Sequence, residues 1–176
     1  MAKLEYYQSL DEKRASFNFV ARKKADRYYR IDDANTFSQW YQAMSETKQS
    51  DGAYANFFRG VSEARNKMYN SAQRYWIQNN LMDLESLSQP IPYLEMIQNM
   101  VNKAKEIKLL QQVFDYYEIT QEQMDIPILS ILQHYKAPTP LLDWTYELDI
   151  ALYFAICDVR RSERKDVIED YVSITG

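Results

Sequence analysis

The sequence is poor in several residue types, and each shortage excludes a class of site. Three glycines in 176 residues are too few for a glycine-rich phosphate loop or for many tight hairpins. The single cysteine, Cys157, excludes an internal disulfide framework and suits a reducing compartment. One histidine and one cysteine cannot build a zinc site of the usual nitrogen and sulfur type, so we expect no bound metal.

Long apolar runs and an excess of basic residues are also missing. The longest apolar run, IALYFAIC, is far shorter than the roughly 20 residues that cross a bilayer, and the N-terminus lacks the apolar region of a signal peptide. The formal net charge of −4 and a pI near 5.1 argue against bulk binding to nucleic acid. We therefore expect a cytoplasmic protein that binds neither a membrane nor bulk nucleic acid.

The chain does have enough apolar sequence for a core. Its length and its hydrophobic content of 46% suit one globular domain. Residues 1–32 are dense in charge and are expected to form a solvated lead-in, with a basic arm for nucleic acid or lipid as the alternative. The domain itself is expected over residues 33–176.

Apolar residues recur at helical spacing along most of the chain. One apolar stripe on a helix is formed by Phe37, Trp40, Tyr41 and Met44. Asp33, Asn35 or Thr36 is expected to cap the start of this helix. Further helices are expected over residues 62–81, along the periodic stretch 89–119, from Thr120 or Asp125 toward Tyr135, and over 147–159. Pro92 suits a first helical turn, whereas Pro138 and Pro140 must end the helix before them.

Strand patterns are fewer and shorter. We expect strands in YANFFRG, which ends at Gly60, in LLDWT at residues 141–145, and in VIEDYVSIT at residues 167–175. The sequence therefore predicts an α+β fold, rich in helix with a small mixed sheet. Sheets usually have more strands than this, so we expect the sheet to be completed by chain beyond the C-terminus or by a partner.

Arg59 lies between aromatic residues and a glycine, in a segment whose aromatic residues favour burial. A buried guanidinium needs several acceptors, which a carboxylate or a phosphate supplies. Two interpretations stay open: an internal pair with Asp143, or a clamp for a ligand's phosphate or ribose.

The other candidate residues cluster around the prolines that follow the fourth helix. His134 is either a hydrogen-bonded core residue or a catalytic group. Asp143 can cap the next helix or hold Arg59, and Trp144 can be a core residue. Thr145 is a natural N-cap for the helix that follows.

Two stretches together resemble the FRG domain, a bacterial and phage-associated family named for its Phe-Arg-Gly motif, here Phe58, Arg59 and Gly60. The family's second signature is matched by Gln133, His134, Tyr135, Pro138, Thr139, Leu141, Leu142, Asp143, Trp144 and Thr145, with Ala151 to Ala155 in the helix behind it. Lys136 and Pro140 depart from the usual Gly and Arg of that signature. The missing Arg removes one donor for a phosphate.

A weaker resemblance, to the ADP-ribosyltransferase fold, bears on function. It implies that Arg59 holds the pyrophosphate or ribose of NAD, that Thr145 braces the strands, and that aromatic residues stack on nicotinamide. It also implies a catalytic glutamate on a late strand, to stabilise an oxocarbenium-like state. That residue is expected after Gly176, because Glu169 precedes the strand and is a poor substitute.

The resulting hypothesis is a nucleotide-binding cleft with NAD as its ligand. Its predicted catalytic residues are His134, Arg59 and Thr145, and its predicted cofactor-binding residues are Arg59, Tyr135, Thr139, Asp143 and Trp144. Whether the chain is an enzyme stays open. The alternative is a non-catalytic module that binds a partner protein through its tyrosine-rich surface, and a nuclease ranks last.

Overall fold

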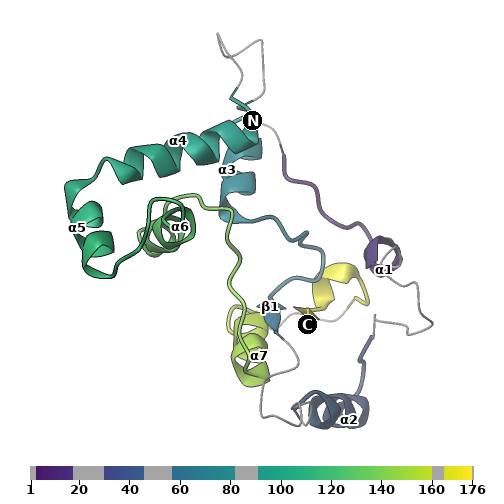
Figure 1. Cartoon of the computed structure of the whole chain (residues 1–176). Helices are drawn as coiled ribbons and strands as arrows, with labels where there is room; N and C mark the ends of the chain where they lie inside the picture. Colours follow the sequence, from purple (N-terminus) through teal and green to yellow (C-terminus); the bar gives the residue numbers. More distant parts are fainter. Residues whose placement is uncertain (1–2, 18–29, 46–56, 82–90, 160–164, 176) are drawn as a thin grey trace. The chain divides into compact units, whose positions relative to one another are not determined.

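The computed structural model describes residues 3–17, 30–45, 57–81, 91–159 and 165–175 (Figure 1). Within this part the chain forms seven α-helices, one short 3₁₀ helix and two short strands. Contacts divide the chain into two compact units. Unit 1 comprises Met1–Glu5 and Met68–Leu142, and unit 2 comprises Tyr6–Lys67 and Asp143–Gly176.

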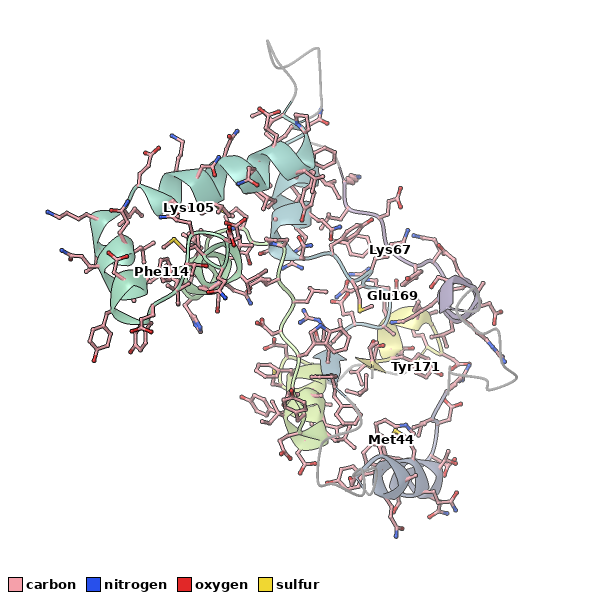
Figure 2. All side chains as sticks on the ribbon, viewed as in Figure 1. Met44, Lys67, Lys105, Phe114, Glu169 and Tyr171 are labelled. Atoms are coloured by element: carbon pink, nitrogen blue, oxygen red, sulfur yellow. The ribbon has the colours of Figure 1, made fainter. Side chains whose placement is uncertain are left out.

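Unit 1 is helical in its described part. Its helices are α3 (Ser71–Gln78), α4 (Tyr93–Lys105), α5 (Lys108–Tyr116) and α6 (Asp125–His134). Helix α4 packs against both α5 and α6. Between them lies one core cluster, formed by Val101, Ala104, Phe114, Met124, Ile128 and Leu129. Phe114, labelled in Figure 2, enters this cluster from α5.

The helix predicted over residues 62–81 is wrong in its first half, since α3 begins only at Ser71. The reason is a capping box at Asn70. The Asn70 side chain accepts the backbone N–H of Gln73 at 2.8 Å, and the Gln73 side chain accepts the N–H of Asn70 at 3.0 Å. These bonds satisfy donors that a helix start leaves without partners, and so fix the start at this residue.

The long periodic stretch 89–119 forms two helices, because the chain turns between Lys105 and Lys108. The break turns the buried residues of α4 and the buried Phe114 of α5 toward the same core cluster. Pro92 stands at the N-cap of α4, as its fixed φ favours. The helix predicted before the prolines is confirmed as α6, which ends at His134.

Unit 2 combines helices with the sheet. Its elements are α1 (Leu10–Phe17), α2 (Ala34–Ser45), β1 (Arg59–Val61), α7 (Leu148–Ile156), a 3₁₀ helix (Ile168–Asp170) and β2 (Ser173–Thr175). Strand β1 pairs with β2 in antiparallel register, with Gly60 opposite Ile174. The α+β class is confirmed. The sheet of the described residues is two-stranded and antiparallel, however, and not mixed.

The core of unit 2 forms between α7, α2 and β1. Phe58, Leu148 and Ala151 are buried there, and Trp40, Tyr41, Met44, Leu152 and Ile174 pack around them. The predicted stripe of α2 is thereby confirmed, apart from Phe37, which is 40% exposed. The cap is confirmed as well, since Oδ1 of Asp33 accepts the backbone N–H groups of Asn35 and Thr36, each at 2.9 Å.

The strand predictions need correction at both motifs. The strand expected to end at Gly60 instead runs over Arg59–Val61, and residues 54–56 of that prediction lie outside the described residues. The segment LLDWT is not a strand, because only Thr145 forms a bridge, with Phe58. Its Leu141 packs on the core cluster of unit 1. The final strand is confirmed for residues 173–175 alone.

From Tyr6 onward, the described part of the charged lead-in belongs to unit 2. Tyr6 forms a bridge with Asn66, and Lys13 is only 5% exposed, so the prediction of a solvated segment is wrong at Lys13. Its Nζ donates to the carbonyl of Ala64 at 2.6 Å, and burial lowers the pKa of Lys13 to about 8. Most of the predicted basic arm lies outside the described residues. Among the described helices, none has the length and apolar character needed to cross a bilayer.

Candidate functional site

The glycine of the Phe-Arg-Gly triplet allows β1 to pack directly on α7, which lies beside it in Figure 1. A Cβ placed on Gly60 would lie 1.7 Å from the carbonyl oxygen of Ala151 and 2.8 Å from the backbone nitrogen of Ala155. Both obstacles are backbone atoms, which cannot move aside as a flexible side chain could. The two alanines, Ala151 and Ala155, are small enough to permit this contact. Only glycine fits this position.

The two sequence motifs meet at a short backbone ladder within unit 2. The N–H of Phe58 donates to the carbonyl of Thr145 at 2.6 Å, and the N–H of Thr145 donates to the carbonyl of Phe58 at 2.9 Å. This exchange of two hydrogen bonds defines an antiparallel pair. The Phe-Arg-Gly triplet and the Asp-Trp-Thr segment are therefore one structural element.

The ladder has two faces, because side chains alternate along an extended chain. One face is turned to α7, as the buried Phe58 and Gly60 show. Arg59 consequently lies on the opposite face. On the partner segment, the same alternation places Trp144 and Tyr146 opposite to Thr145.

The register of the ladder brings four side chains together on the face away from α7. It sets Phe57 across from Tyr146, and their ring centroids are 4.7 Å apart. Two residues along from that pair, counting from the Phe58–Thr145 bridge, Arg59 takes the position opposite Trp144, and its Nη1 donates to the carbonyl of the preceding Asp143. Phe57, Trp144 and Tyr146 are 51%, 43% and 49% exposed, and Arg59 is half-buried. We call Phe57, Arg59, Trp144 and Tyr146 the ladder face.

The guanidinium of Arg59 is tied to the ladder itself. Its Nη1 donates to the main-chain carbonyl of Asp143 at 2.6 Å. The acceptor in this bond is thus the backbone of Asp143, and the Asp143 side chain is exposed. The bond holds one terminal nitrogen of the guanidinium against the Asp-Trp-Thr segment.

Thr145 lies on the other side of the ladder from Arg59. Its Oγ1 accepts the backbone N–H of Glu147 at 3.0 Å. The N-cap of α7 is Glu147, so the prediction that Thr145 is the N-cap residue is wrong, and Thr145 instead orders the turn before it. A catalytic role for Thr145 stays a prediction.

The remaining predicted residues belong to unit 1. His134 ends α6 and is exposed, so its interpretation as a core residue is wrong. Tyr135 is 82% exposed. The catalytic role of His134, the cofactor-binding role of Tyr135 and a cleft shared with Arg59 stay predictions.

Thr139 has no exposed surface, and its polar groups are bonded within unit 1. Its Oγ1 donates to Oε1 of Gln133 at 2.9 Å, and its N–H donates to Oγ of Ser71, also at 2.9 Å. Its carbonyl accepts the N–H of Ala72 at 3.0 Å. These bonds join the end of α6 to the start of α3, which gives Gln133 and Thr139 a structural purpose in the signature.

Comparison with protein families matches residues 54–164 to the FRG domain, a range that includes both the triplet and the long signature. The chain belongs to the FRG domain family. No curated protein and no solved structure matches it. Within the described residues, no group of His, Cys, Asp and Glu side chains could hold a metal ion.

Two members of the ladder face, Phe57 and Tyr146, were absent from the predicted site. Alternation along the chain was the available signal. Phe57 is two residues before Arg59 and Tyr146 is two residues after Trp144, so in an extended chain each lies on the same side as that residue. Using it requires the register between Phe58 and Thr145, and the sequence does not contain that register.

Proposed function

We propose that this FRG domain binds a NAD-like nucleotide on the ladder face. The observation that carries the proposal is the Phe58–Thr145 register, which puts Arg59 opposite Trp144 and two residues from the Phe57–Tyr146 pair. Such a face offers a fixed cation and several partly exposed rings within reach of one small ligand.

The chemistry of these groups matches the parts of a nucleotide. A guanidinium presents N–H donors in a planar fork that fits phosphate oxygens. Aromatic rings stack on bases of any sequence, a contact that contributes about 1–3 kcal/mol per base. We assign Arg59 to the phosphates and Trp144, with the Phe57–Tyr146 pair, to the base.

A transferase activity related to ADP-ribosyltransferases is the finer form of this proposal. Its support is the weaker resemblance described above, in which an early strand carries the Arg. The reaction would need a carboxylate to stabilise positive charge on the ribose. Glu169 lies in the 3₁₀ helix before β2, and its Oε1 is 3.5 Å from Nη1 of Arg65, so it is engaged elsewhere. The proposal for the described residues is accordingly one of binding.

Thermal unfolding with and without millimolar NAD or ADP-ribose tests the proposal. A ligand at about 100 times its Kd adds about 2.7 kcal/mol to the free energy of unfolding. Arg59→Ala should abolish that gain. Arg74→Ala is the matched control, because Arg74 also donates from Nη1 to a backbone carbonyl, that of Tyr69, but belongs to unit 1. Equal stabilisation of all three proteins, or of none, would contradict the proposal.

The alternative, a module that binds a partner protein, is favoured by a different observation. Helix α7 exposes large apolar side chains on the side turned away from its buried residues. This surface does not include the ladder face, so the two functions do not exclude each other.

A further inference from the structure

The segment that contains β1 has a different neighbour on each of its two edges. Both backbone polar groups of Phe58 bond to Thr145. The next residue, Arg59, is paired instead with Thr175 of β2. The backbone polar groups of consecutive residues in a strand point to opposite edges. Arg59 therefore lies in the middle of the face turned away from α7, between the Asp-Trp-Thr segment and β2.

Strand β2 places two hydroxyl side chains on this same face. Residues directly opposite each other in an antiparallel pair share a face, so Thr175 joins Arg59. Ser173 follows by alternation, because Ile174 between the two turns the other way and packs on the core cluster of unit 2. Both residues are half-buried. Within the described part of the chain, neither hydroxyl forms a hydrogen bond.

The face away from α7 thus changes in chemistry from one edge to the other. Trp144 and Tyr146 stand on one side of Arg59, and the hydroxyls of Ser173 and Thr175 stand on the other. Neighbouring strands lie about 5 Å apart, so about 10 Å separates the row of rings from the row of hydroxyls. A nucleotide has its parts in the same order, with an aromatic base at one end and phosphates at the other. Phosphate oxygens accept hydrogen bonds from both guanidinium and hydroxyl groups.

We propose that Thr175 is a phosphate-binding residue beside the ladder face. The nucleotide lies across β1, with its base toward Trp144 and its phosphates between Arg59 and β2. This inference rests on the proposed function, and it adds a second donor to the phosphate and a direction for the bound nucleotide. Oγ1 of Thr175 donates to a phosphate oxygen, a bond stronger than one between neutral groups. Thr175 therefore favours a nucleotide over the nucleoside that lacks the phosphate.

The test measures the affinity of the full chain for ADP and for adenosine by isothermal titration calorimetry. Thr175→Val keeps the branched shape that suits a strand and removes only the hydroxyl. It should weaken ADP binding at least about tenfold and leave adenosine binding unchanged. Two matched variants, Thr175→Ser, which keeps the hydroxyl, and Ser173→Ala, two residues further from Arg59, should bind ADP within about threefold of the natural protein.

The outcomes separate this inference from the proposed function. Unchanged ADP affinity in Thr175→Val, with a loss in Arg59→Ala, would overturn the role of Thr175 and leave the proposed function standing. An equal loss for ADP and adenosine in Thr175→Val would overturn it too, because a disturbed strand weakens both ligands. Inorganic phosphate that displaces ADP at equal concentration would show an anion site without a base, and so contradict the direction of the nucleotide. If the natural protein bound neither ADP nor ADP-ribose, both proposals would be wrong.

Discussion

The long signature of the family, residues 133–145, is divided between the two units, and its two halves have different structural surroundings. In unit 1, Gln133 and Thr139 bond to the chain around them, and Thr139 has no exposed surface. In unit 2, Trp144 follows a few residues later and is 43% exposed, next in sequence to Asp143, whose carbonyl accepts a hydrogen bond from Arg59. The first half of the signature therefore stabilises a helical core, and the second half carries the partly exposed side chains to which we assign the proposed binding. A single sequence motif can therefore contain both buried residues that stabilise a core and exposed residues on a surface.

The hydrophobic cores of the two units also differ, in how they are packed. Unit 1 is closed by large side chains such as Phe114 and Ile128, whereas unit 2 depends on the close approach of β1 to Ala151 and Ala155. Large side chains can adjust to a change, but two backbones in contact cannot. Unit 2 should be the less tolerant of added volume.

The largest effect is expected from Gly60→Ala. The added methyl would overlap the backbone of α7 and should lower the free energy of unfolding by about 3 kcal/mol or more. Urea denaturation measures the loss. Val61→Ala, one residue along and on the opposite face, is the control and should be milder. If Gly60→Ala proved as stable as Val61→Ala, the close contact between β1 and α7 would be refuted.

A second effect should appear only in alkaline solution. The folded state holds the pKa of Lys13 at about 8, below its ordinary 10.5, so between these values the unfolded chain binds more protons. The free energy of unfolding of the natural protein should therefore rise with pH across this window, by at most about 3 kcal/mol. The buried charge opposes folding most strongly below pH 8.

Lys13→Met should remove this contribution. Relative to that variant, the natural protein should gain stability from pH 8 to 10.5, as measured by urea denaturation at a series of pH values. The exposed Lys103→Met provides the control and should keep the rise. An equal rise in the natural protein and in Lys13→Met would show that Lys13 is not buried as described.

A smaller effect is expected from Thr139→Val, which removes the hydroxyl and keeps the shape. The loss of the bond to Gln133 should cost about 1–2 kcal/mol in urea denaturation. The exposed Thr120→Val should cost less than about 0.5 kcal/mol. Nucleotide affinity should be unchanged in Thr139→Val, because Thr139 has no exposed surface and is not part of the ladder face. A loss of affinity without a loss of stability would instead support its predicted place in the ligand site.

Sequence patterns predicted the helices better than the strands. The stripe of α2, the presence of a helix within residues 147–159 and the stop before Pro138 follow from spacing and proline geometry alone. The strands are only three residues long, too short for alternation to mark their ends, and LLDWT is apolar partly because Leu141 enters the core of unit 1. The family motifs located Arg59 and Trp144. They did not reveal Phe57 and Tyr146, since these join the site only through the long-range pairing of Phe58 with Thr145.

The most direct test of the ladder face is tryptophan fluorescence during titration with ADP-ribose. The chain has three tryptophans, and only Trp144 lies on the ladder face. Stacking of the base should quench the emission of the natural protein and of the Trp40→Phe and Trp76→Phe variants, and leave that of Trp144→Phe unchanged. If Trp144→Phe were quenched as strongly as the natural protein, the nucleotide would bind elsewhere or not stack, and the assignment of the ladder face would be contradicted.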